Sequence, residues 1–455
     1  MYKRKILAAS IAVMLSLPLC AVAVDSAELQ QIRKEMQQIN EQYEARIKAL
    51  EARVEQAEAK AANAQAVAET AASAPPANAQ TVSSAPQDTL GSASANAFNP
   101  AISLVLVGTL AEFDNDPDAY GIPGFALGHE AGPGEEGFSL GESELNIEAN
   151  IDDKLFGSLT LALASEDGET KVELEEAYIQ TLALPSGFTL KGGRFFSRIG
   201  YLNELHAHAD DFVDRPLAYR ALLANQYGDD GVQVRWIAPT DLFAEFGGEW
   251  FRGDRFPGGG ADNEGKGTYS VFAHVGGDIG ASQSWRAGLS HLRAKADGRE
   301  TEGAFGPSVF SGDSNVTIAD LVWKWAPNGD PGRTNLKFQA EYLQRDEDGL
   351  LNDTAYSGTQ DGWYAQGVYQ FMPRWRAGVR YDRLNAGDNG AAFAGSVLDD
   401  LGHTPERFTA LLEYDNSEFS RLRLQYNLDE SQPDTDHQLF LNYVVSLGAH
   451  SAHPF

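Results

Sequence analysis

The sequence is poor in cysteine and in positive charge. Cys20 is the one cysteine among 455 residues, so the chain has no second thiol for a disulfide or for a cysteine-based metal site. Lys and Arg number 35 against 65 Asp and Glu, which gives a formal net charge of −30. Nucleic-acid binding requires a basic footprint, so this balance argues against such a partner. Beyond the N-terminus, no segment approaches the roughly 18 consecutive apolar residues of a transmembrane helix.

Signatures of common enzymes are missing too. We find no G-x-S-x-G, no H-E-x-x-H and no paired C-x-x-C. The stretch GADNEGKG (260–267) nearly matches a phosphate-binding loop, but it ends in Gly267 and leads into a strand-like segment. The sequence therefore predicts no bond chemistry, and we expect that the protein is not an enzyme.

The first 23 residues predict a secretory signal peptide. Lys3, Arg4 and Lys5 precede an apolar run, and Ala21-Val22-Ala23 provides small residues for cleavage. A lipoprotein signal that uses Cys20 is the alternative, although Leu19 stands where a small residue is expected. Cleavage after Ala23 removes the only cysteine and three positive charges, so the exported chain would carry −33 rather than −30.

Residues 24–70 predict a helical coiled coil in the periplasm. From residue 27 the segment has no Gly or Pro, and apolar residues recur at spacings of three and four, with one stutter. Such a seam requires partner chains, which predicts an oligomer; a lone amphipathic helix packed on the rest of the protein is the alternative. Residues 71–97 are rich in Ala, Ser and Pro and predict a flexible linker.

Residues 98–455 alternate between apolar and polar side chains. In SRLRLQYNL, for example, Leu422 and Leu424 oppose Arg421 and Arg423. Short breaks in this pattern alternate with long acidic or Gly-rich breaks. Tight turns at one rim and long loops at the other are typical of a barrel in the bacterial outer membrane. The prediction is an all-β fold, an antiparallel transmembrane β-barrel of about 16 strands with lipid outside and water inside.

The break at 197–229 is long enough to have a function of its own. Its apolar residues argue for an ordered loop, which in a barrel can fold inward and narrow the lumen. Asp210, Asp211 and Asp214 would then face arginines of the inner wall and form a pore constriction that orients dipolar solutes. The arginines of this predicted constriction are Arg235, Arg376, Arg380, Arg421 and Arg423.

This region also carries a family resemblance. A strand ending in GRFF, a loop containing DFVDRPL and a return strand DDGVQVRW resemble trimeric outer-membrane porins, in particular the phosphate-selective type. The resemblance covers 98–455. It implies a homotrimer, with passive diffusion of small hydrophilic solutes or ions through each barrel and a third loop that constricts the pore. The chain lacks the lysine run of phosphate-selective members, so phosphate selectivity is not carried over. The order of signal peptide, coiled coil and barrel also resembles certain sugar porins.

The stretch LHAHADD raises a second hypothesis. His206, His208 and Asp210 lie two residues apart and share one face of an extended chain, as ligands of a zinc-like divalent cation would. In that case the protein would bind or take up metal. The alternatives are that these side chains are polar loop groups that require no cofactor, or that the coiled coil makes the protein a structural tether to the cell wall.

Overall fold

The computed structural model describes residues 100–448 except 167–168, 261–262 and 302–305. The predicted signal peptide, coiled coil and linker lie outside the described residues. Within the described part, no helix is long and apolar enough to cross a membrane.

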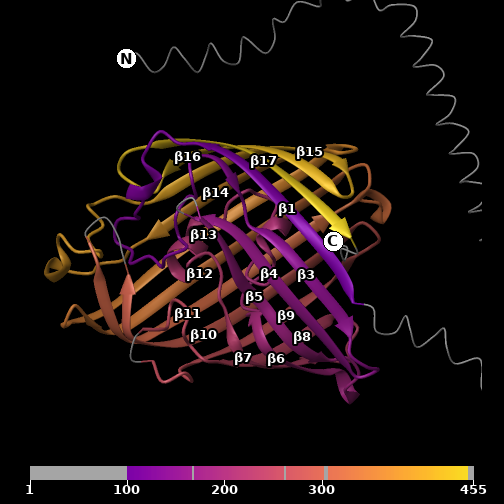
Figure 1. Ribbon diagram of the computed structural model, residues 1–455, viewed down its shortest axis with the longest axis horizontal. Coiled ribbons are helices and arrows are strands. Elements are labelled where there is room, and N and C mark those ends of the chain that lie inside the picture. Colours follow the sequence, from indigo (N-terminus) through magenta and orange to yellow (C-terminus); the bar gives the residue numbers. More distant parts are fainter. Residues whose placement is uncertain (1–99, 167–168, 261–262, 302–305, 449–455) are drawn as a thin grey trace, which may run out of the picture. The chain divides into compact units, whose positions relative to one another are not determined.

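Residues 101–448 form one antiparallel sheet that closes on itself (Figure 1). β1 pairs along its length with β17, with Ser103 opposite Gly448 and Glu112 opposite Leu439. β2 and β3 both pair with β1, so these two segments form one interrupted strand, and the 17 segments make a barrel of 16 strands. The fold class predicted from the sequence is confirmed. The segments are β1 (Ala101–Glu112), β2 (Gly137–Leu140), β3 (Ser143–Asn150), β4 (Leu155–Glu166), β5 (Glu169–Thr181), β6 (Phe188–Phe196), β7 (Gly228–Ile237), β8 (Phe243–Phe251), β9 (Thr268–Ile279), β10 (Gln283–Thr301), β11 (Ser308–Trp325), β12 (Asn335–Leu351), β13 (Thr354–Met372), β14 (Trp375–Asn385), β15 (Glu406–Ser417), β16 (Ser420–Glu430) and β17 (Asp436–Gly448).

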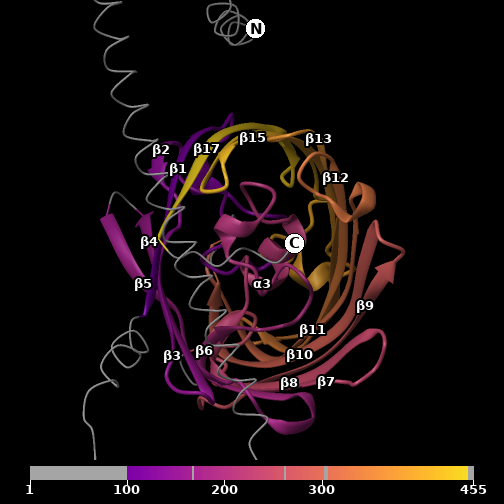
Figure 2. The same ribbon diagram turned by 90° about the vertical axis from the view of Figure 1, so that its right-hand side faces the viewer.

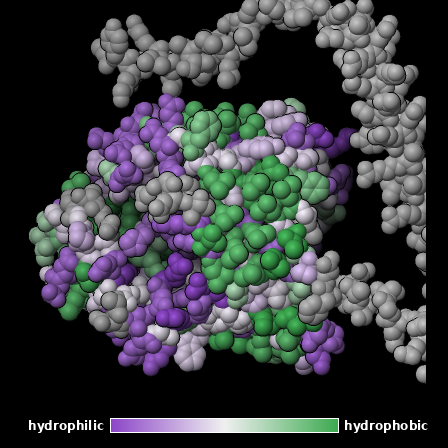
Figure 3. All heavy atoms as spheres, viewed as in Figure 1, coloured by the Kyte–Doolittle hydropathy of each residue, from purple (hydrophilic) through white to green (hydrophobic). Residues whose placement is uncertain are grey.

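Apolar side chains face outward and polar side chains face inward. On β16, Leu424 is 46% exposed, whereas Arg423 is 2% and Gln425 0% exposed. Figure 3 shows hydrophobic residues gathered over the strands at the right of this face and hydrophilic residues toward its left end. A soluble protein has the reverse distribution. Together with closure, which pairs the backbone groups of the edge strands, this distribution is that of a barrel that crosses a lipid bilayer.

The interior differs in one respect from the water-filled lumen that the alternation predicts. A helix, α3 (Leu217–Leu223), lies inside the ring of strands, and all seven of its residues are buried (Figure 2). It contacts β12, β13 and β14. Inward-facing Leu292, Val316 and Leu343 pack in the same apolar cluster as this helix. The inner wall is therefore partly apolar, because it must bury the apolar residues of the loop that enters the lumen.

The wall is irregular between β4 and β6. The register of β4 against β5 shifts by one residue between Thr160 and Leu161, which leaves Glu175 as an extra residue on β5. On its other side, β5 pairs with β6 over four residue pairs only, from Ala177–Arg194 to Gln180–Lys191. A β-bulge increases strand bending and redirects side chains. The strict alternation of inward and outward side chains is therefore interrupted in this part of the wall.

Candidate functional site

The inward loop, residues 197–227, connects β6 to β7 and contains α3. Its two ends are joined by Asn203, whose Nδ2 donates to the carbonyl oxygens of Ser197 and Tyr227, at 2.8 Å each. The amide of Tyr227 donates to Asn203 Oδ1 at 2.7 Å. Pro216 precedes α3, and Ala224 with φ of +50° ends it. The sequence predicted an ordered loop at 197–229, and the structure has one that lies within the lumen.

Two aspartates attach the inward loop to the wall. Asp211 forms ion pairs with Arg376 at 2.6 Å and Lys337 at 2.9 Å. Asp214 forms ion pairs with Arg380 and Arg407, both at 2.8 Å. We call these two aspartates and their four wall partners the aspartate clamp. Asp214 also pairs within the loop with Arg220 of α3, at 3.0 Å.

Backbone carbonyls of the loop engage two further arginines of the wall. Arg423 Nη1 donates to the carbonyl oxygens of Asp210 at 2.9 Å and Phe212 at 3.1 Å. Arg421 Nη2 donates to the carbonyl oxygens of Asp210, at 3.1 Å, and His208. The wall arginines thus contact the loop directly, instead of facing it across an open gap.

Two residues of the predicted constriction are placed differently. The carboxylate of Asp210 forms an ion pair with Arg215 of the same loop, at 2.7 Å, and not with the wall. Arg235 pairs with Glu245 on β8 at 3.4 Å and is not part of the aspartate clamp. The structure therefore brings together Asp211, Asp214, Arg376 and Arg380, with Arg421 and Arg423 holding the loop backbone beside them.

The neighbouring aspartates have opposite electrostatic environments. Burial alone would raise the pKa of Asp211, but Lys337 and Arg376 hold it well below its usual range. Burial is likewise outweighed at Asp214, where Arg407 and Arg380 lower the pKa. At Asp210, by contrast, burial raises the pKa to about 6, although Arg215 lowers it. One oxygen of Asp210, Oδ1, has no hydrogen-bond partner among the described residues.

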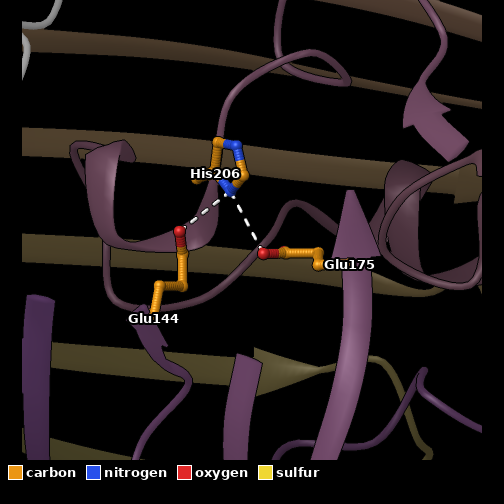
Figure 4. A group of neighbouring side chains, drawn as sticks. All are labelled: Glu144, Glu175 and His206. Atoms are coloured by element: carbon orange, nitrogen blue, oxygen red, sulfur yellow. Dashed lines mark hydrogen bonds and ion pairs between the residues drawn. The ribbon is translucent and has the colours of Figure 1, made fainter. Parts of the chain in front are cut away.

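The two histidines lie in a second group of side chains, away from the aspartate clamp. His206 Nδ1 lies 3.0 Å from Glu144 Oε2 and 3.2 Å from Glu175 Oε2 (Figure 4), and its Nε2 lies 3.1 Å from Glu176 Oε2. His208 Nδ1 lies 2.6 Å from Glu144 Oε1. We call these five residues the histidine cluster. Burial alone would lower the pKa of His206, but the Glu144, Glu175 and Glu176 carboxylates raise it well above its usual range. Of the predicted metal ligands, His206 and His208 are together, and Asp210 is elsewhere.

The bulge in β5 explains why two consecutive glutamates reach one histidine. In a regular strand, neighbouring side chains point to opposite faces, so one of Glu175 and Glu176 would face lipid. The extra residue at 175 breaks this alternation. Both carboxylates consequently reach the imidazole of His206, one at each ring nitrogen.

One known protein is similar to this chain over most of its length. No family model matches the chain. An uncharacterized protein of Aquifex aeolicus (strain VF5) is 31% identical over 392 residues, which cover 80% of this chain and 81% of that protein.

The chain belongs to the same family as the Aquifex aeolicus protein.

Several solved structures are similar to this chain, at much lower sequence identity. The outer membrane channel DcaP of Acinetobacter baumannii is 12% identical, with coverage of 77% of this chain and 97% of that one and a TM-score of 0.49. The anion-selective porin from Comamonas acidovorans is 11% identical, with coverage of 77% and 99% and a TM-score of 0.48. A loop-deletion mutant of OmpT, an outer membrane protein of Vibrio cholerae, is 15% identical, with the same coverage and a TM-score of 0.48. The resemblance to phosphate-selective porins stays a prediction.

Sequence reasoning missed several members of both groups. Lys337 and Arg407 of the aspartate clamp lie on strands whose alternation was recognised, but nothing in the alternation showed which inner-wall cation meets which loop residue. Glu144, Glu175 and Glu176 were not singled out. The sequence does contain a signal for Glu175 and Glu176. The outward-facing residues Val172 and Leu174 have even numbers, whereas the outward-facing Ile179 has an odd number. That change of phase within VELEEAYI indicates an extra residue.

Proposed function

We propose that the protein is a channel of the bacterial outer membrane through which small hydrophilic solutes or ions diffuse passively. One observation carries the proposal. A closed barrel with an apolar exterior holds an inward loop by ion pairs to its inner wall, so a polar route through the membrane is narrowed by a segment fixed in place.

Two cavities lie at opposite rims of the barrel and support this route. One, of about 270 Å³, is lined by the turn between β15 and β16 and by Asp211 and Arg376 of the aspartate clamp. The other, of about 280 Å³, is lined by residues of the long loops after β1 and β8 and by the end of α3. Short turns and long loops lie at different rims of an antiparallel barrel. The inward loop therefore lies between the two cavities, and we expect its position to set the conductance.

Planar-bilayer recording of the purified full chain tests the channel. We expect stepwise conductance, and a larger single-channel conductance in the double variant Asp211→Asn, Asp214→Asn, because loss of both carboxylates releases the loop from four wall cations. The matched control is Asp153→Asn, Asp241→Asn, which changes the same charge at two exposed positions in short turns. A folded barrel, verified by circular dichroism, that carries no current would overturn the proposal.

We further propose that the protein assembles as a homotrimer, with residues 24–70 in the periplasm. The support is the heptad pattern, which requires partner chains, and the resemblance to trimeric porins. Native mass spectrometry of the exported chain and of a chain that starts at residue 71 distinguishes assembly through residues 24–70 from assembly through the barrel. A monomer in both cases would refute the trimer, and a trimer in both would place its contacts in the barrel. If the protein were instead a structural tether to the cell wall, its function would persist when the channel is blocked and would be lost without residues 24–70.

A further inference from the structure

We propose that Glu144, Glu175 and His206 bind one divalent transition-metal ion of the zinc class, with Glu176 and His208 as positioning residues. This ligand set replaces the one that the sequence suggested, because Asp210 is held by Arg215 instead. The proposal goes beyond the channel function, since the site can bind metal whether or not the barrel conducts.

The three ligand atoms already lie together. One ring nitrogen of His206 and one oxygen each of Glu144 and Glu175 fall within 4.8 Å of one another. An imidazole nitrogen and carboxylate oxygens bind zinc at about 2.0–2.2 Å, so ligand atoms around one ion lie roughly 3 to 4 Å apart. The observed separations of 3.0 and 3.2 Å from His206 Nδ1 require only small side-chain adjustments.

Hydrogen bonding alone leaves this arrangement incomplete. His206 Nδ1 faces an oxygen of Glu144 and an oxygen of Glu175 at almost equal distances (Figure 4). A ring nitrogen carries one hydrogen at most, so it can donate well to one carboxylate and not to both. An ion placed between the three atoms would satisfy both carboxylates at once.

The second ring nitrogen has the partner that a metal-bound histidine needs. Nε2 lies 3.1 Å from Glu176 Oε2. If Nε2–H donates to this carboxylate, Nδ1 presents its lone pair to the ion, as in the carboxylate–histidine–metal arrangement of many sites. His208 acts on the other side, because its Nδ1 lies 2.6 Å from the Glu144 oxygen that His206 does not contact. The bulge in β5 supplies both a ligand and its orienting partner.

The charge of the histidine cluster also favours a cation. Three carboxylates face two histidines, and Glu144 and Glu176 are buried. The ion pairs of Glu144, Glu175 and Glu176 run to His206 and His208. With all three carboxylates ionised and both histidines protonated, the histidine cluster carries one net negative charge, which Lys191 partly offsets at Glu176. Burying net negative charge is costly, and a bound divalent cation would lower that cost.

The site has an entry path. Glu175 lines the cavity of about 280 Å³ together with Glu142 and Phe196. This cavity adjoins the part of β5 that is not paired with β6. Three protein ligands beside a cavity leave a coordination position for water or for a ligand of the ion. Calcium and magnesium prefer sites built from six or more oxygens, so the nitrogen ligand favours zinc over both.

Calorimetric titration of the detergent-purified full chain with ZnCl₂ tests the site. We expect a zinc-binding event that His206→Ala abolishes and that Glu175→Gln, which keeps the side-chain volume, weakens at least ~10-fold. His403→Ala, at a half-buried position in the loop between β14 and β15, is the control and should leave the affinity unchanged. Titration with MgCl₂ should give no comparable event.

The positioning role of Glu176 has its own test. Glu176→Ala should weaken zinc binding about 10- to 100-fold. Glu176→Gln keeps an oxygen that accepts from Nε2–H and should restore most of that loss, which a general effect on folding would not do. Circular dichroism of each variant verifies the barrel. Zinc binding that is absent in the wild type, or unchanged in both His206→Ala and Glu175→Gln, would overturn the proposal even if the channel conducts.

Discussion

Asp214 is the residue on which the attachment of the inward loop depends most. Its carboxylate accepts from three arginines, Arg220, Arg380 and Arg407, and all four side chains are nearly inaccessible to solvent. Removing one partner of a buried ion pair costs about 3–5 kcal/mol, because the remaining charge is left without compensation. Asp210, four residues earlier in the chain, has a single ion-pair partner and one oxygen without a hydrogen bond.

This contrast predicts the pH dependence of stability. An aspartate in the unfolded chain has a pKa of about 4, whereas that of Asp210 in the folded protein is about 6. Between these values the folded state binds the extra proton at Asp210, so the contribution of Asp210 to the free energy of unfolding should increase as the pH falls from 6 to 4. The pKa values of Asp211 and Asp214 are lowered, so their contribution is present above about pH 4 and is lost as the pH falls further.

Urea unfolding of wild type and Asp210→Asn between pH 7 and 3.5 measures the effect. The variant loses the ion pair with Arg215 but also lacks a carboxylate that must ionise in a buried place, so its stability relative to wild type should change with pH. On going from pH 7 to pH 4, we expect the variant to lose about 2 to 3 kcal/mol of stability relative to wild type. Asp153→Asn, exposed in a short turn, should show no such change. A pH-independent difference for Asp210→Asn would contradict the assignment.

At the scale of elements, α3 is unusual because every one of its residues is buried. A seven-residue helix has little stability of its own, so its order must come from packing. Apolar residues of the loop after β1 (Ile122, Phe125 and Leu127) pack in the same cluster as the helix and the inner wall. The helix is thus held by apolar contacts, and the segment before it by ion pairs.

Truncation of one apolar residue of α3 tests this division. Leu222 is fully buried, so Leu222→Ala should lower the free energy of unfolding by about 2–5 kcal/mol. We expect limited proteolysis to cut Leu222→Ala within the inward loop sooner than wild type. Leu182→Ala, at a position 47% exposed in the turn after β5, is the control. Equal cleavage rates in Leu222→Ala and wild type would show that the ion pairs alone hold the loop.

The same elements show how far the sequence predicts the structure. Alternation such as Leu422–Arg423–Leu424 reports local geometry, so the strands and their inward faces were predicted correctly. The long loop was recognised because its apolar residues have no reason to face water. The pairings inside the lumen were not predictable, because they depend on closure of the barrel. Glu144 and His206, for example, are 62 positions apart in the chain and meet only once β3 and the inward loop share one interior.

At the scale of the whole molecule, the net charge of −30 is unevenly distributed. Four arginines are buried inside the barrel: Arg345, Arg380, Arg407 and Arg423. The first three form ion pairs with acidic side chains, and Arg423 donates to Asn442 Oδ1 and to backbone carbonyls of the inward loop. Exposed acidic residues lie in the long loops and also in short turns, as at Asp153 and Asp241. Asp346, Asp348, Asp361 and Asp388 line a cavity of about 560 Å³ near the loop ends of β12 and β13. Asp346 and Asp361 lie on the outward faces of these strands, in phase with the exposed Tyr342 and Trp363. Negative potential at one mouth of a channel raises the local concentration of cations.

We therefore expect a channel that prefers cations, most clearly at low salt. In a KCl gradient the reversal potential should have the sign of potassium permeation. The cation preference should weaken near 1 M salt, because the electrostatic screening length is about 3 Å there and about 10 Å at about 0.1 M salt. Replacing Asp346, Asp348 and Asp388 together by asparagine should move the reversal potential toward zero, and replacing the same three by glutamate, which keeps the charge, should leave it unchanged. An anion preference in the wild type would contradict this expectation. It would mean that the arginines of the inner wall, and not these aspartates, control permeation. The aspartate-to-asparagine variant would then strengthen the anion preference.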